Sequence, residues 1–75
     1  MIAVTDDNVY FIRHGELWCN DVDHFNKPPN NGCLVGVAAT TLNNGVARQE
    51  RIAVIDDNGK VFVYTTHDNM GWQQL

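Results

Sequence analysis

The chain has 75 residues, a formal net charge of −4 and a hydrophobic share of 44%. These values predict one small globular domain over residues 1–75, not a disordered segment. The chain has only five basic residues, so we do not expect it to bind nucleic acid directly, because affinity for phosphates comes from clustered Lys and Arg. No apolar run approaches the roughly 20 residues of a membrane span. The N-terminus lacks the pattern of a signal peptide, so we expect a cytoplasmic protein with reduced cysteines.

The chain begins with a predicted β-hairpin. Two apolar runs, Ile2–Thr5 and Val9–Arg13, flank acidic residues that favour turns. A turn at Asp7-Asn8 would place Asp6 opposite Val9.

This opening hairpin is similar to the centre of the chain. IAVTDDN at 2–8 matches IAVIDDN at 52–58 in six of seven positions, at a spacing of fifty residues. That spacing is close to the length of a β-propeller blade, and IAVIDDNGKVFVYTTHDNMGW resembles the inner strands of such a blade. No Trp-Asp or Gly-His signature is present, and a closed ring would require a homo-oligomer. Two similar hairpins packed as opposing parts of a small sandwich or barrel are the preferred interpretation, with chance convergence as a further alternative.

Residues 14–32 form the irregular part of the sequence. Trp18, Val22 and Phe25 follow a helical spacing, but the polar residues between them are poor helix formers, so at most a turn or two is predicted. Pro28-Pro29 favours an extended path. Long loops in compact domains are often functional. We expect Trp18 and Phe25 to close an open end of the sheet, with ligand binding as the alternative.

Residues 33–66 carry the most regular strand pattern, and two Asn-Gly pairs mark its turns. Asn-Gly favours a two-residue type I′ turn, because both residues adopt positive φ. Turns at Asn44-Gly45 and Asn58-Gly59 predict a three-stranded antiparallel meander with strands at 33–42, 46–57 and 60–66. Together with the first hairpin this makes a small all-β fold of about five strands, either a sandwich or a partly open barrel.

The two predicted turns fix one register, which places Val54 opposite both Val35 and Val63. Counting from each turn divides the apolar residues between two faces of the sheet. One face is predicted to carry Val35, Val37, Ile52, Val54, Val61 and Val63, and the other Leu34, Ile55, Phe62 and Tyr64.

Both faces of the predicted meander become polar toward Asn44-Gly45. The hairpin 38–50 is therefore expected to project into solvent beyond the core, where packing does not explain its length. We predict that it contacts a partner, with Arg48, Gln49 and Arg51 as the binding residues.

The C-terminal tail carries one aromatic anchor, Trp72, which follows a bend at Gly71. Docking of this ring on the sheet is the preferred interpretation. Exposure as a recognition residue is the alternative.

The sequence holds little that could support catalysis. It contains no serine, and its two glutamates, Glu16 and Glu50, lie far apart. No phosphate-binding loop, dinucleotide fingerprint or metalloprotease motif is present. Cys19 with His14 or His24 could form a thiolate–imidazole pair, but no oxyanion loop adjoins them. We therefore expect a protein that is not an enzyme.

Four residues could in principle hold zinc, namely His14, Cys19, His24 and Cys33. Structural zinc sites usually have tightly spaced ligand pairs, whereas these residues are separated by gaps of four, four and eight residues. We therefore expect free thiols and no metal or cofactor. A zinc site, and a Cys19–Cys33 disulfide in an exported form, remain alternatives.

Together these features predict a non-enzymatic protein–protein interaction module or a small acidic inhibitor. Its partner would be a protein, including one with a basic site that normally holds nucleic acid. The predicted contacts are Arg48, Gln49, Arg51, Trp18, Phe25 and Trp72. A lectin-like unit related to a propeller blade, with Trp18, Trp72 and Tyr64 as stacking platforms, is one alternative, and a zinc-stabilised binding module is another.

Overall fold

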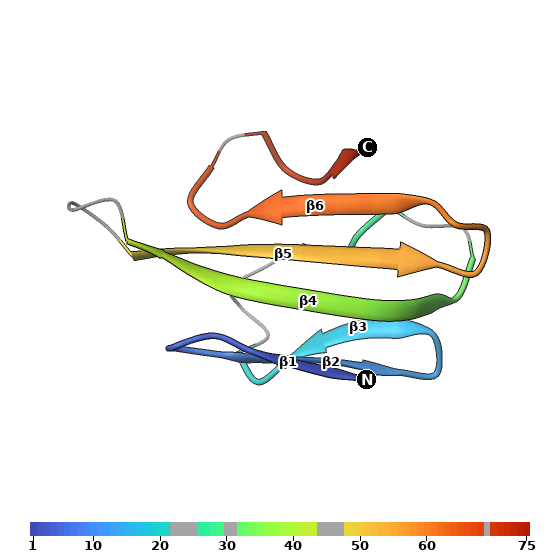
Figure 1. Cartoon of the computed structure of the whole chain (residues 1–75), viewed down its shortest axis with the longest axis horizontal. Helices are drawn as coiled ribbons and strands as arrows, with labels where there is room; N and C mark the ends of the chain where they lie inside the picture. The colour runs from blue at the N-terminus through green and yellow to red at the C-terminus, as the bar shows by residue number, and fades with distance from the viewer. Residues whose placement is uncertain (22–25, 30–31, 44–47, 69) are drawn as a thin grey trace.

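In the computed structural model, residues 1–21, 26–29, 32–43, 48–68 and 70–75 are described. Within these residues the chain forms seven strands and no helix (Figure 1). The strands are β1 (Ile2–Val4), β2 (Val9–Arg13), β3 (Glu16–Cys19), β4 (Leu34–Asn43), β5 (Arg48–Asp56), β6 (Val61–Thr65) and β7 (Gln73–Gln74). The predicted all-β fold built from antiparallel hairpins is therefore confirmed, and β3 and β7 are the strands that the sequence did not predict.

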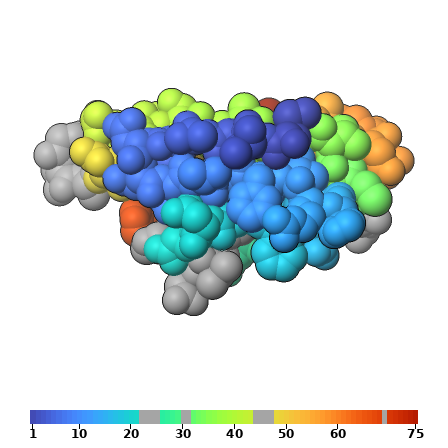
Figure 2. Space-filling view, turned by 90° about the horizontal axis from the view of Figure 1, so that it is seen from below, coloured from blue at the N-terminus to red at the C-terminus, as the bar shows by residue number. Residues whose placement is uncertain are grey.

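The strands form two antiparallel sheets, ordered β1-β2-β3 and β4-β5-β6-β7. The first sheet lies beside β4 in Figure 1, and both β1 and β2 pack against β4. Seen from below in Figure 2, β1 and β2 spread across this side of the molecule. The arrangement fits the predicted sandwich or partly open barrel.

The core lies between the two sheets and takes side chains from both. Its buried members are Tyr10, Leu17 and Cys19 from the first sheet and Leu34, Ile52, Val54, Phe62 and Tyr64 from the second. Within β5 and β6 the buried residues alternate with more exposed ones, as expected for a sheet that packs on one face.

The strands β2 and β3 are joined by a two-residue turn that the sequence did not reveal. His14 and Gly15 have φ angles of 54° and 75°, and Arg13 pairs with Glu16. Positive φ at both central residues is the type I′ geometry that was expected at the Asn-Gly pairs. Trp18 lies in β3, so the helical turn predicted around it is wrong at that residue, while Val22 and Phe25 lie outside the described residues.

The connection between β5 and β6 is longer than predicted. Asp56 N donates to Lys60 O at 3.0 Å, which leaves three residues in the loop, and Gly59 has a φ of 82°. The buried Asp56 carboxylate accepts the backbone N–H groups of Asn58 and Lys60 at 2.9 Å each. This capping favours a three-residue loop with glycine in the left-handed position over a two-residue turn.

The register of the meander consequently differs from the prediction. Val54 pairs with Phe62 in β6 and with Val37 in β4, so the predicted alignment with Val63 and Val35 is wrong. A β-bulge between Leu34 and Gly36 adds a further shift in β4. The predicted turn at Asn44-Gly45 lies outside the described residues.

This change of register exchanges the faces of β6. Phe62 and Tyr64 point into the core together with Ile52 and Val54, whereas Val61 and Val63 share the opposite face with Ile55. A slip of one residue has this effect because successive side chains alternate across a strand.

The first hairpin turns one residue earlier than predicted, because Thr5 N donates to Asn8 O at 2.9 Å and leaves Asp6-Asp7 as the two-residue loop. Val4 pairs with Val9, so Asp6 does not lie opposite Val9. The Thr5 hydroxyl accepts the backbone N–H groups of Asn8 at 2.9 Å and Asp7 at 3.3 Å. A threonine turn of this kind satisfies the turn's own backbone donors and stabilises the turn from Thr5 to Asn8.

The two turn glycines predict a difference in tolerance to substitution. A Cβ at Gly15 would lie 2.9 Å from the Cys33 Cβ, whereas a Cβ at Gly59 would meet nothing within 4 Å. We expect Gly59→Ala to cost roughly 1–2 kcal/mol for the left-handed backbone alone. Gly15→Ala should cost about 1–3 kcal/mol more, because the side chain must also displace Cys33. Urea unfolding of both variants measures this difference, and equal losses would contradict the predicted clash.

Candidate functional site

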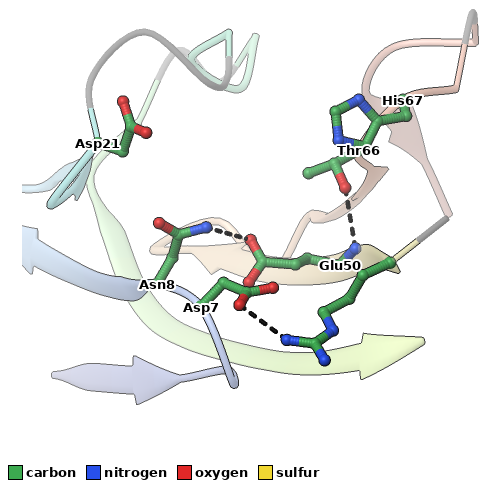
Figure 3. Close-up of a pocket in the computed structure, with 7 residues that line it drawn as sticks. Asp7, Asn8, Asp21, Glu50, Thr66 and His67 are labelled. Carbon is green, nitrogen blue, oxygen red and sulfur yellow. Dashed lines mark hydrogen bonds and ion pairs between the residues drawn. The ribbon is translucent and has the colours of Figure 1, made fainter. Parts of the chain in front are cut away.

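A polar cleft of about 250 Å³ lies where the β1–β2 connection meets the start of β5. Figure 3 shows Asn8 and Asp7 directed toward β5, with the Glu50 side chain between Asn8 and Thr66. The cleft is lined by Asp7, Asn8, Asp21, Arg48, Glu50, Thr66 and His67.

The Glu50 carboxylate forms the buried centre of this cleft, with only 4% of the residue exposed. Its Oε1 accepts hydrogen bonds from Asn8 Nδ2 at 2.8 Å and from the Tyr10 hydroxyl at 2.5 Å. Its Oε2 accepts a hydrogen bond from the Thr5 hydroxyl. Three donors from the first sheet and its turn therefore converge on one acid of the second sheet. Hydrogen bonding to several donors is what allows a carboxylate to be buried.

The backbone of Glu50 is bonded to the segment that follows β6. Glu50 N donates to Thr66 Oγ1 at 2.8 Å, and Thr66 N donates to Glu50 O at 2.9 Å. The neighbouring Gln49 Nε2 donates to Thr66 O at 3.1 Å. The start of β5 is thus held on both sides, by the first hairpin and by the end of β6.

These contacts overturn the expectation that the hairpin 38–50 lacks packing. Asp6 N donates to Thr41 Oγ1 at 2.9 Å, and Arg48 Nη1 pairs with Asp7 Oδ1 at 3.0 Å. The β1–β2 turn therefore covers one side of the predicted projection, and stability accounts for much of its length. Glu50 could not be recognised from the sequence as the residue around which the cleft is organised, because its three donors lie 45, 42 and 40 residues away along the chain.

Burial also lowers the reactivity of the two groups beside Glu50 that could act as nucleophiles, Tyr10 and Cys19. Burial, followed by the hydrogen bond to Glu50, raises the pKa of Tyr10 well above its usual range. Burial likewise raises the pKa of the Cys19 thiol. Both groups are therefore held in their protonated, weakly nucleophilic forms at neutral pH.

The three polar residues predicted to bind a partner lie in different surroundings. Arg48 is engaged with Asp7, and Gln49 with Thr66, so both are part of the contacts around Glu50. Arg51 instead lies in the cross-strand row Thr40–Arg51–Thr65, on the face of the second sheet that points away from the core.

The predicted aromatic contacts are engaged with the chain itself. Trp18 lies opposite Phe11, and Lys27 Nζ is 3.9 Å from the centroid of its ring. Trp72 stacks on Tyr64 with ring centroids 5.2 Å apart, and its Nε1 donates to the Asn26 carbonyl at 2.5 Å. Trp72 is thus docked on the sheet, as preferred from the sequence. Phe25 lies outside the described residues.

The four candidate zinc ligands are not gathered at one place in the described part of the chain. Cys19 is buried in the core, Cys33 is exposed, and both are free thiols. His14 occupies the β2–β3 turn, and His24 lies outside the described residues. Over the described ranges, no three His, Cys, Asp or Glu side chains are placed to hold a metal ion.

The face of the second sheet that points away from the core is apolar. Two adjoining shallow depressions of about 250 Å³ each share Ala38 and Ala53, and no other described segment lies in front of β4–β6 in Figure 1. Ile55, which borders them, is 38% exposed. We call this surface the outer patch, formed by Gly36, Ala38, Ala53, Ile55, Val61 and Val63.

Arg51 lies at one end of the outer patch, beside Ala38, Ala53 and Val63. Its guanidinium forms no hydrogen bond or ion pair with any described residue. The outer patch is therefore an apolar surface with one unpaired cation at its border, and the register shift of β6 is what placed Val61 and Val63 on it.

Comparison with known proteins gives no relative. The chain matches no family model, no curated protein and no solved structure closely enough to indicate a relationship. In the part of the chain that the structure describes, no helix has the length and apolar character needed to cross a membrane.

Proposed function

We propose that the protein is a non-enzymatic interaction module that binds a partner protein through the outer patch. The observation that supports this function is an apolar sheet face, of the composition found in protein cores, that no described segment covers. Contiguous exposed apolar surface of this kind marks interaction sites in soluble proteins. A reducing, cytoplasmic setting is part of the proposal, and the free thiols of Cys19 and Cys33 are compatible with it.

The state of the reactive groups favours binding over catalysis. The Glu50 carboxylate accepts hydrogen bonds from three donors of the chain itself, and the raised pKa values of Tyr10 and Cys19 keep these groups protonated. A nucleophile must be deprotonated to react, so Tyr10 and Cys19 are poor nucleophiles at neutral pH.

The chemistry of the described surface also weighs against the two alternative functions, an acidic inhibitor and a lectin-like unit. An acidic inhibitor of a nucleic-acid site would present carboxylates, whereas the patch is apolar and its bordering charge is Arg51. A lectin-like site would need open aromatic faces, but Tyr64 is buried against Trp72 and Lys27 lies over Trp18. Apolar docking of a protein is therefore the mode that the described surface supports best.

A charge introduced into the outer patch tests this function. Immobilised wild-type protein would be compared with Ala53→Asp in extracts of the native host, and retained proteins quantified by mass spectrometry. Burying an unpaired carboxylate against an apolar partner costs several kcal/mol, so we expect Ala53→Asp to retain its partner at least about tenfold less well.

Met70→Asp is the matched control, because Met70 is 66% exposed and lies outside the outer patch. It introduces the same charge and should retain the same partner as the wild type. Thermal melts of both variants establish that each is folded. A partner retained equally by Ala53→Asp and Met70→Asp would refute the proposed function.

A further inference from the structure

The dimensions of the outer patch fit a single secondary-structure element. Three neighbouring strands span about 10 Å at their spacing of about 4.8 Å, and the rows from Gly36 to Thr40 span about 14 Å along the strand. A helix with its side chains is about 10 Å wide, and about nine residues of it cover 14 Å.

The backbone of the occupant decides between a helix and an extended strand. A single strand lying flat on a sheet face cannot hydrogen-bond to that sheet, so its buried backbone groups would stay unsatisfied. Strand addition to the second sheet is hindered at both edges, because β1 packs against β4 and the opposite edge strand, β7, has only two residues. A helix satisfies its own backbone groups and buries only its side chains.

The relief of the outer patch favours the close approach of a helix. Ala38 and Ala53 form a low floor, and the larger side chains of Ile55 and Val61 stand beside it. The Ile55 side chain fills the space over Gly36, where an added Cβ would lie 2.9 Å from Ile55 Cγ2. Apolar side chains of a helix can therefore pack onto Ala38 and Ala53, beside the larger side chains of Ile55 and Val61.

The charge at the border of the patch excludes a second copy as the best occupant. Arg51 is unpaired among the described residues, and the outer patch itself contains no carboxylate. Face-to-face packing of two copies would bring two such cations to one apolar interface without an acid to neutralise them. A buried or half-buried cation without a partner is unfavourable, so complementarity requires a carboxylate from another protein.

We infer that the outer patch binds an amphipathic helix of a partner protein, with a carboxylate of that helix paired to Arg51. This inference rests on the proposed function and specifies the chemistry of its partner. The helix places apolar side chains spaced at i, i+3 or i+4 and i+7 on Ala38 and Ala53. Its acidic residue follows at the end that overlies Arg51.

Two peptide libraries displayed on phage test the inference. Both present helices of about 14 residues, about 21 Å long, with randomised apolar positions on one face. One library fixes Glu, and the other fixes Lys, at both ends of that face. On wild-type protein we expect the Glu library to enrich at least about tenfold over the Lys library, and on Arg51→Glu the preference should reverse. Backbone amide NMR signals of Ala38, Ala53 and Val63 should shift when an enriched peptide is added.

Three outcomes would overturn the inference. If the Glu library is still preferred on Arg51→Glu, no carboxylate of the helix pairs with Arg51. If neither library enriches on the wild-type protein relative to Ala53→Asp, the outer patch does not bind a helix. Self-association of the wild-type protein that is abolished by Ala53→Asp, measured by sedimentation, would make a second copy the occupant. Failure of the peptides while Ala53→Asp still loses its partner in extracts would leave the proposed function standing, whereas a partner kept by Ala53→Asp refutes both.

Discussion

Glu50→Ala is expected to lower the free energy of unfolding by about 3–5 kcal/mol, because it leaves three hydrogen-bond donors without their acceptor and each such loss costs about 1–3 kcal/mol. The substitution removes the acceptor of Thr5, Asn8 and Tyr10 and leaves these donors facing an empty site. A domain of this size has roughly 4–11 kcal/mol of stability, so the variant should unfold at a much lower urea concentration and temperature. Urea denaturation followed by tryptophan fluorescence measures the loss.

Glu16→Ala is the matched control, since Glu16 and Glu50 are the chain's two glutamates. The Glu16 side chain is 59% exposed and pairs with Lys27 at 3.7 Å, and exposed pairs of this kind contribute about 0–1 kcal/mol. Tyr10→Phe, alone and combined with Glu50→Ala, completes a double-mutant cycle. We expect a coupling energy of about 1 kcal/mol or more, because both residues share one hydrogen bond. A Glu50→Ala variant as stable as Glu16→Ala would show that the cleft does not hold the sheets together.

The second large effect is expected in the core of β5, where Ile52 and Ile55 point to opposite faces. Ile52 is 0% exposed and Ile55 is 38% exposed. Ile52→Ala should cost about 2–5 kcal/mol through lost burial and a residual cavity. Ile55→Ala, on the outer patch, should cost about 1 kcal/mol or less, in proportion to the smaller area it buries.

The same pair of variants separates stability from binding. Ile55→Ala should weaken partner binding through the outer patch and lower the melting temperature by no more than about 4–8 °C. Ile52→Ala should lower the melting temperature much further and leave binding unchanged when it is assayed below its melting point. Equal losses of stability at the two positions would mean that both faces of β5 are covered, which would also remove the surface needed for the proposed function.

The wrongly predicted register of the meander illustrates what local sequence signals can and cannot specify. Asn58-Gly59 predicted a two-residue turn, but the buried Asp56 carboxylate caps the backbone N–H groups of Asn58 and Lys60 and stabilises a three-residue loop. That single extra residue moved Val63 from the face predicted to carry Ile52 and Val54 to the outer patch. The strand itself was predicted correctly, because its alternating apolar residues do not depend on the register.

The candidate surface was predicted only in part. Arg51 was named as a contact from the polarity of its hairpin, and the structure places it at the border of the outer patch. Arg48 and Gln49 were named for the same reason, yet they belong to the contacts around Glu50. Polarity alone does not distinguish these residues, because the partners Asp7 and Thr66 come from distant parts of the chain.

The sequence by itself determined the all-β class, the hairpin connections and the positions of the apolar strand residues. These properties follow from local preferences, since β-branched residues favour strands and Gly, Asn and Asp favour turns. Only the tertiary structure decided which face of the second sheet became the core. Both faces of β5 and β6 are apolar, so alternation could not rank them. Packing of Tyr10 and Leu17 from the first sheet buried Ile52 and its neighbours and left the outer patch uncovered.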